Sequence, residues 1–325
     1  MDTPEITGPV WIPTAPPSIE TFLAPTLQPV PILPVLALLL AAAYLTGAVR
    51  LWVDGRRWPV GATLSFLLGC AVIVVVMGAG IEGYGYRLFS VFMFQQLTLM
   101  MAVPPLLVLG RPGTLLLRAM PHNAAGRAGF AIARWGLRSG AGRIALHPGL
   151  TIPLFLFCFY VIYLGGAASS LLGSWLGHVS LEIVFLVGGL LFTIPLLSTD
   201  PLPVRLGHAG RAIDLLLEMP LHAFFGVILM MATTPLVAVF AAPPGSWAVD
   251  PITDQSIAGA LAWSYGELPG LLIALTIMVR WQRDDTRRAA AADREIDLHG
   301  DPALDAYNAR LAQLHRGDGE PRGRP

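Results

Sequence analysis

Lysine is absent from this 325-residue sequence, and all 21 basic residues are arginines. Because a retinal chromophore is attached through a lysine Schiff base, the absence of lysine excludes a retinal protein. Only two cysteines occur, Cys70 and Cys158, and each lies inside an apolar run. Without a CxxC pair or several loop cysteines, the sequence predicts neither a disulfide framework nor a thiolate copper loop.

Charge of either sign is also scarce. Charged residues make up 13% of the chain, against roughly 25% in ordinary soluble domains. Hydrophobic residues make up 54%, mean hydropathy is +0.63, and the apolar residues form long runs. Such runs indicate an integral membrane protein surrounded by lipid. The formal net charge is zero, which gives no reason to expect a nucleic-acid partner. No nucleotide, haem or catalytic motif has standard spacing, so we expect no enzyme.

Apolar segments divide the chain into about seven expected transmembrane helices, each near the 20 residues that a bilayer requires. The sixth expected span contains Pro220 and Pro235, which predict a kink or a tilt. The sequence thus predicts an all-α bundle. Its expected spans are 32–53, 61–80, 88–109, 150–172, 176–197, 212–240 and 257–281.

Arginine positions predict the orientation of this bundle. Twenty of the 21 arginines lie in or beside the linkers after the first, third and fifth spans, or in the C-terminal tail. Arg87 alone falls on the opposite side. Because arginine is retained in the cytoplasm, we expect an extracytoplasmic N-terminus and a cytoplasmic C-terminus.

The same segments define the expected domains. Residues 1–30 are Pro-rich and contain no arginine, which indicates an extended extracytoplasmic leader without a cleaved signal. A transmembrane domain, 31–282, follows and includes a basic cytoplasmic loop, 111–149. Within this loop, 122–146 fits either an amphipathic helix on the inner leaflet or a loose loop. The charged tail, 283–325, contains a short helix that Asp301 would cap.

Two polar residues lie near the outer start of the fifth expected span. His178 and Glu182 are four positions apart, so they share one helical face. A neutral imidazole and a carboxylate can hold a metal ion together. We take both as candidate metal ligands, with a hydrogen-bonded interfacial pair as the alternative.

The sixth and seventh spans carry further polar residues within the membrane. His222 follows Met219 by three positions, and imidazole with thioether suits Cu(I); a hydrogen bond to a neighbouring helix is the alternative. Glu267 lies near the membrane midplane, where a carboxylate is costly unless it is paired or hydrated. It can pair with His222 from the adjacent antiparallel span. All three are candidate metal ligands.

Asp254 and Gln255 are further candidate functional residues, at the outer entry to the seventh span. An aspartate at the start of a helix ordinarily caps the backbone there. We therefore expect Asp254 to cap its own helix.

Several short motifs occur in a specific order along the chain. They are PPLLVLGRP at 104–112, DPLP at 200–203, MPLHAFFG at 219–226, DQ at 254–255, GELP at 266–269, RW at 280–281 and AYNARL at 306–311. With this ordered set, the chain from about residue 44 to 314 resembles the CtaG family of membrane-embedded cytochrome c oxidase assembly factors. The actinobacterial form, found fused to CopD-like copper-resistance domains, is the most similar in pattern.

This resemblance implies a seven-span protein of the bacterial plasma membrane that assists copper-centre maturation in the respiratory oxidase, with oxidase subunits as partners. It carries over His222, Asp254 and Glu267 as functional residues. Family members usually have a histidine pair at the start of span three, flanking a methionine that corresponds to Met93. Here those positions are Phe92 and Gln96. Two alternatives stay open: a copper transport or resistance protein, and a degenerate paralogue that binds a partner but no metal.

Overall fold

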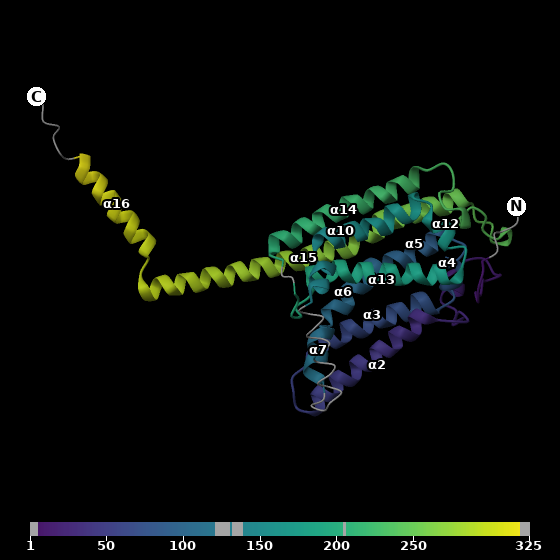
Figure 1. Cartoon of the computed structure of the whole chain (residues 1–325), viewed down its shortest axis with the longest axis horizontal. Coiled ribbons are helices and arrows are strands. Elements are labelled where there is room, and N and C mark those ends of the chain that lie inside the picture. Colours follow the sequence, from purple (N-terminus) through teal and green to yellow (C-terminus); the bar gives the residue numbers. More distant parts are fainter. Residues whose placement is uncertain (1–5, 121–130, 132–138, 204–205, 319–325) are drawn as a thin grey trace, which may run out of the picture. The chain divides into compact units, whose positions relative to one another are not determined.

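The computed structural model describes residues 6–120, 131, 139–203 and 206–318. The chain divides into two compact units, Met1–Ile277 and Met278–Pro325. Helices dominate the described residues, and the one isolated β-bridge among them joins Thr7 to Ser174. The predicted all-α membrane fold is therefore confirmed (Figure 1).

Six helical stretches among the described residues are long and apolar enough to cross a membrane. The third stretch, Phe89–Ala119, is built from α5 (Phe89–Leu97), the π-helical segment η1 (Thr98–Ala102), α6 (Val103–Leu109) and α7 (Pro112–Ala119). The other five are α2 (Ile32–Val53), α3 (Val60–Gly78), α13 (Trp175–Leu197), α14 (His208–Met231) and α15 (Pro251–His299).

A shorter apolar stretch, Pro148–Leu164, corresponds to the fourth expected span. It consists of α10 (Pro148–Leu156), the π-helical segment η2 (Phe157–Val161) and α11 (Ile162–Leu164). The count of seven spans and their orientation stay predictions. The remaining elements are α1 (Ile19–Phe22), α4 (Ile81–Gly85), α9 (Gly140–Ala145), α12 (Ala167–Leu171), η3 (Ala238–Phe240), η4 (Gly245–Trp247) and α16 (Pro302–Asp318).

Two local expectations have different outcomes. The sixth helix was expected to reach 240, and this is wrong: α14 ends at Met231, so Pro235 lies outside it and kinks no helix. The expected cap of the tail helix is confirmed, because the Leu304 backbone N–H donates to Asp301 Oδ1 over 3.1 Å. The proposed amphipathic segment 122–146 lies largely outside the described residues.

Glycine allows the helices of the first unit to pack closely, as small residues do in membrane bundles. Helix α13 packs against α6 and η1 (Figure 1). A Cβ atom at Gly189 of α13 would lie only 2.1 Å from the carbonyl oxygen of Met100. Likewise, a Cβ atom at Gly226 of α14 would lie 2.6 Å from the carbonyl oxygen of Gly259 in α15. Larger residues would push these helices apart.

The described part of the segment before α2 packs against one end of the bundle, where α4 and α12 lie (Figure 1). The Trp175 backbone N–H donates to the Thr7 carbonyl over 2.8 Å, and the Tyr84 hydroxyl donates to the Ala15 carbonyl over 3.0 Å. The Gln28 side chain bonds both the N–H and the carbonyl of Trp11, at 2.9 and 3.0 Å. These bonds hold the segment over the start of α13.

Candidate metal centre

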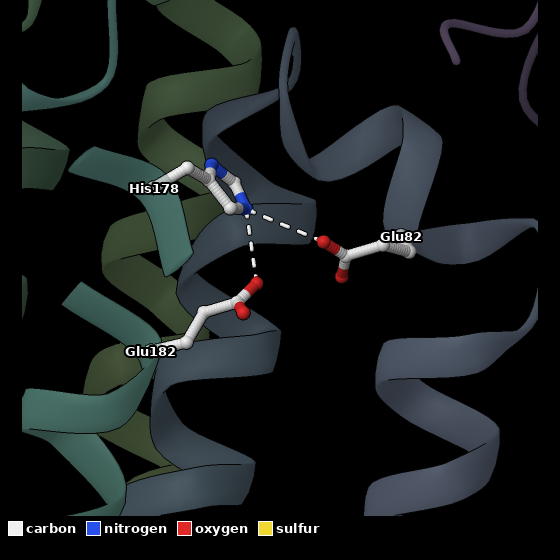
Figure 2. Close-up of side chains that lie close together, drawn as sticks. All are labelled: Glu82, His178 and Glu182. Carbon is white, nitrogen blue, oxygen red and sulfur yellow. Dashed lines mark ion pairs between the residues drawn. The ribbon is translucent and has the colours of Figure 1, made fainter. Parts of the chain in front are cut away.

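Two carboxylates and one imidazole meet at this end of the first unit (Figure 2). His178 Nε2 lies 3.1 Å from Glu182 Oε1 and 3.6 Å from Glu82 Oε1. His178 and Glu182 are one turn apart on α13, whereas Glu82 comes from α4. All three residues are at most 4% exposed. We call Glu82, His178 and Glu182 the outer cluster.

Neighbouring side chains fix the orientation of this cluster. Gln95 of α5 donates from Nε2 to Glu82 Oε2 over 2.6 Å. The Tyr86 ring stacks on the His178 imidazole, with centroids 3.9 Å apart and an interplanar angle of 17°. Because Glu82 has its Oε2 bonded by Gln95, its Oε1 is left facing His178. The cluster is thus held in place by α5 and by the turn after α4.

Several polar atoms of the outer cluster lack hydrogen-bond partners among the described residues. These atoms are His178 Nδ1, His178 Nε2 and Glu182 Oε1. The 3.1 Å pair of His178 and Glu182 meets the distance of an ion pair but not the angles of a hydrogen bond. Buried polar atoms are normally paired, so His178 Nε2 and Glu182 Oε1 are candidate donors to a shared ligand. The donor atoms lie within 4.8 Å of one another, close enough to share one ion.

A small cavity adjoins the cluster. It holds about 10 Å³ and is lined by Glu82, Glu182, Tyr86 and Gln28, among others. That volume is near the roughly 10–15 Å³ that one water molecule or small ion requires. Gln28 belongs to the segment before α2, so this segment forms part of the wall.

Burial raises the pKa of the Glu82 carboxyl, the neighbouring Glu182 carboxylate raises it too, and His178 opposes both effects. The two carboxylates therefore do not readily carry their charges together at this buried place. The two charges of a divalent cation would balance them. Because buried charge is costly unless compensated, the cluster fits a divalent cation.

The chemistry of these donors narrows the class of metal. Imidazole nitrogen and carboxylate oxygen suit Cu(II), Zn(II) and other borderline divalent ions, of which Cu(II) binds most tightly. Cu(I) prefers sulfur ligands, and the outer cluster offers none. The residues therefore fit copper in its divalent form.

Phe92 and Gln96 occupy the two positions at which the family resemblance implies histidines. The two residues have different surroundings. The Phe92 ring lies 5.0 Å from the His178 ring, centroid to centroid. Gln96 instead donates from Nε2 to the Cys158 carbonyl over 3.3 Å and accepts from the Tyr163 hydroxyl. Position 92 therefore adjoins the outer cluster. Met93 between them is fully buried in the hydrophobic core.

The structure also brings together His222 and Glu267, with 3.8 Å between Nε2 and Oε1. Glu218 joins them, because its Oε1 lies 2.9 Å from His222 Nδ1. Met219 packs beside Gly270 of α15, where an added Cβ would lie 3.8 Å from its Sδ.

Asp254 does not cap its own helix, so that expectation is wrong. Asp250 takes this role by accepting from the Thr253 backbone N–H over 2.8 Å. Asp254 Oδ2 instead accepts from the Phe89 backbone N–H over 2.6 Å, and its Oδ1 accepts from the Ser90 hydroxyl. It therefore caps α5 from across the bundle.

Gln255 ties α15 to the segment that follows α14. Its Oε1 accepts from the Leu236 N–H over 2.8 Å, and its Nε2 donates to the Thr234 carbonyl over 3.2 Å. Both residues of this dipeptide thus have structural hydrogen bonds.

Two acidic residues were not predicted: Glu82 of the outer cluster, and Glu218 beside His222. Glu82 lies in a linker rather than in an expected span, so the cost of a charge in the membrane did not single it out. Glu218 precedes His222 by four positions, the same interval that separates His178 from Glu182. That repeated spacing was the available signal for Glu218, whereas Glu82 had no comparable signal.

One known protein family matches most of the chain. The family model described as "Cytochrome c oxidase caa3 assembly factor (Caa3_CtaG)" matches residues 42–284. Uncharacterised proteins of Mycobacterium bovis and Mycobacterium tuberculosis are each 38% identical over 281 residues, which cover 85% of this chain and 42% of theirs. A Mycobacterium leprae protein is 37% identical over 286 residues, 86% of this chain and 43% of its own. The chain thus spans less than half the length of these relatives. No solved structure matches.

Proposed function

Because the chain belongs to the family of cytochrome c oxidase caa3 assembly factors, we propose that it delivers copper to a respiratory oxidase during assembly. In this proposal the copper ion is cargo, held by the outer cluster as Cu(II) and passed on to an oxidase subunit. The protein catalyses no reaction of its own. Its location is the membrane of the bacterial cell, in keeping with six apolar helices and mycobacterial relatives.

The observation that carries this proposal is that Glu82, His178 and Glu182 lie side by side in the buried interior. Two carboxylates and an imidazole have donor atoms within 4.8 Å of one another, and burying two carboxylates together is costly unless their charge is compensated. A packing role would be served at lower cost by apolar residues of similar volume.

The sidedness of the proposal follows from arginine. The outer cluster lies at the α4 end of the bundle, opposite α7, which has Arg111 at its start and Arg118 in its last turn (Figure 1). In this proposal the positive-inside rule makes the α4 end extracytoplasmic. Copper held there would be passed to an oxidase subunit whose copper centre lies on the same side of the membrane. Oxidase subunits are therefore the proposed partners, together with the surrounding lipid.

Complementation tests this function in a bacterium from which the corresponding gene has been deleted. We expect the wild-type chain, expressed in the context of its full-length protein, to restore oxidase activity and oxidase copper content. The Glu182→Gln variant should accumulate in the membrane but restore neither. The matched control is Glu20→Gln, which changes an exposed glutamate and should behave as wild type.

Two results would refute the proposal. Normal oxidase activity and copper content in the deletion strain would exclude an assembly role. Full restoration by Glu182→Gln would show that the assembly role does not require the outer cluster.

A further inference from the structure

A groove runs along the surface of the first unit where α7 packs against α2 (Figure 1). It holds about 370 Å³, within the range of roughly 300–1,000 Å³ that is typical of ligand sites. Two buried rings, those of Tyr44 and Phe66, line it and stack on each other with centroids 4.1 Å apart. We call it the α2–α7 groove. It is lined by Leu40, Ala43, Gly47, Arg50, Leu116 and Ala119, among others.

The α2–α7 groove has the length of a lipid acyl chain in one leaflet. Leu40 and Arg50 line it ten residues apart on α2, which corresponds to about 15 Å along the helix. Half of the roughly 30 Å hydrocarbon core of a bilayer has the same depth. Among the described residues that line the groove, only Arg50 carries a charge. The groove is therefore apolar along its length and positively charged at one end.

Two tryptophans mark the level of the lipid headgroups at this charged end. Trp52, in the last turn of α2, is 37% exposed. Its Nε1–H donates to the Trp58 carbonyl over 3.1 Å. Tryptophan is enriched where the hydrocarbon of a membrane meets its headgroups. Arg50 precedes Trp52 by two positions, so it lies at the depth at which lipid phosphates are found.

Further arginines gather at the same end of α2. Arg56 Nη1 donates to the Arg118 carbonyl over 2.6 Å, and Arg118 Nη2 donates to the Arg57 carbonyl over 3.3 Å. These guanidinium groups bond carbonyl oxygens, which do not neutralise their charge. The ion pairs of the described residues all lie elsewhere, so none joins Arg50 to Asp54, four positions later.

The sequence supplies few other carboxylates to this end of the groove. No acidic residue occurs between Glu82 and Glu182, so the linker after α7 contributes arginines alone. Asp200 contacts α7 at its opposite end, where it accepts from the backbone N–H groups of Gly113 and Thr114 over 3.0 and 2.9 Å. The arginine end of the groove therefore keeps a net positive charge, which attracts a phosphate group.

We propose that the α2–α7 groove binds an anionic phospholipid from the leaflet on the arginine-rich side of the membrane. One acyl chain lies along the groove from Arg50 towards Leu40, and the headgroup phosphate pairs with Arg50. Arg56 and Arg118 add to the positive potential around the headgroup. Arginines at the membrane surface attract anionic lipids, and the guanidinium group matches the geometry of phosphate. This site shares no residue with the outer cluster and does not depend on the proposed delivery role.

Native mass spectrometry of the purified full chain, released from detergent micelles, tests the charged end of the groove. Phosphatidylglycerol and phosphatidylcholine with identical acyl chains are titrated separately, because only the first carries a net negative charge. We expect one phosphatidylglycerol to bind about tenfold more tightly than phosphatidylcholine. Arg50→Gln should weaken phosphatidylglycerol binding about fivefold, the factor expected for one arginine at a membrane surface. The control is Arg143→Gln, which changes an exposed arginine of α9 outside the groove.

A second pair of variants tests the apolar part of the groove. Ala43 lines the groove and its neighbour Ala42 does not, although both side chains are exposed. Ala43→Phe places a bulky ring where the acyl chain would lie, so it should weaken the binding of both lipids. Ala42→Phe adds the same ring outside the groove and should bind both lipids as the wild type does.

Several outcomes would overturn the proposal. Equal affinity of the wild type for the two lipids would indicate only the general contact of a membrane protein with lipid. Unchanged binding in Arg50→Gln, or an equal loss in Arg143→Gln, would exclude Arg50 as the headgroup ligand. Equal effects of Ala43→Phe and Ala42→Phe would exclude the groove. Displacement of phosphatidylglycerol by an equal concentration of inorganic phosphate would identify a site for free phosphate instead of a lipid.

Discussion

The aromatic ring of Phe92 lies 5.0 Å from the imidazole ring of His178, centroid to centroid. Phe92 belongs to α5 and His178 to α13, so the contact crosses the bundle. A phenyl ring cannot ligate a metal, whereas an imidazole at the same place would approach the cation that we propose for the outer cluster. The outer cluster therefore has three candidate protein ligands and a hydrophobic neighbour in Phe92.

Phe92→His should raise the affinity of the outer cluster for Cu(II). We expect a gain of about tenfold, equivalent to about 1.4 kcal/mol, measured by competition against a chelator of known affinity. The control is Phe94→His on the same helix, because Phe94 packs against Tyr265 at 5.4 Å rather than against His178. An equal gain in both variants would show non-specific binding by the added histidine.

Gln95→Leu should weaken cation binding without removing a ligand. The Gln95 amide donates to Glu82 Oε2 over 2.6 Å, and loss of such a supporting hydrogen bond commonly lowers metal affinity by about 10- to 100-fold. The adjacent Gln96→Leu is the control, since Gln96 bonds Cys158 and Tyr163 instead. Isothermal titration of both variants with Cu(II) provides the measurement. A larger loss in Gln96→Leu would contradict the assigned role of Gln95.

Gly189→Ala should destabilise the bundle, whereas its neighbour Gly188→Ala should be tolerated. A Cβ atom at Gly189 would approach the Met100 carbonyl oxygen to 2.1 Å, but one at Gly188 has its nearest neighbour, Cys158 Sγ, at 3.6 Å. Forced overpacking costs about 1–3 kcal/mol. Thermal unfolding in detergent compares the two variants. Equal midpoints would show that α13 and η1 are not in such close contact.

Asp254→Asn should lower stability more than Asp250→Asn. Asp254 is 4% exposed, and its two oxygens accept hydrogen bonds from the start of α5. An asparagine has only one accepting oxygen, so we expect a loss of about 2 kcal/mol, typical of a hydrogen bond to a charged group. Asp250 is an exposed N-cap, a position that asparagine fills equally well. The midpoints of thermal unfolding distinguish the two cases, and an equal loss would argue against the cross-bundle cap.

Helix positions were largely predictable because each span is a local property of the sequence. The expected span 32–53 coincides with α2, and 176–197 differs from α13 by one residue. The sixth span was predicted too long, because the apolar sequence continues beyond Met231 although the helix ends there. Gln255, which lies 19 residues beyond Leu236, holds that segment in place.

The candidate sites were less predictable because they depend on which helices meet. The one-turn spacing of His178 and Glu182 identified two of the three outer-cluster residues, but Glu82 joins them from a short helix outside the expected spans. Met219 was chosen for its closeness to His222 in sequence. The sulfur that packs against Gly266 beside His222 Nε2 belongs instead to Met101, a residue of another helical stretch. Contacts of this kind are set by tertiary packing.

Copper retention by the purified chain is the sharpest test of whether the outer cluster is a metal site. The protein is loaded with Cu(II) without reductant, passed through a desalting column and analysed for metal and protein. We expect one equivalent of Cu(II) in the wild type, lost in both Glu82→Gln and Glu182→Gln while each variant stays monodisperse. A wild type that retains no copper, or a Glu182→Gln variant that retains the full equivalent, would contradict this expectation.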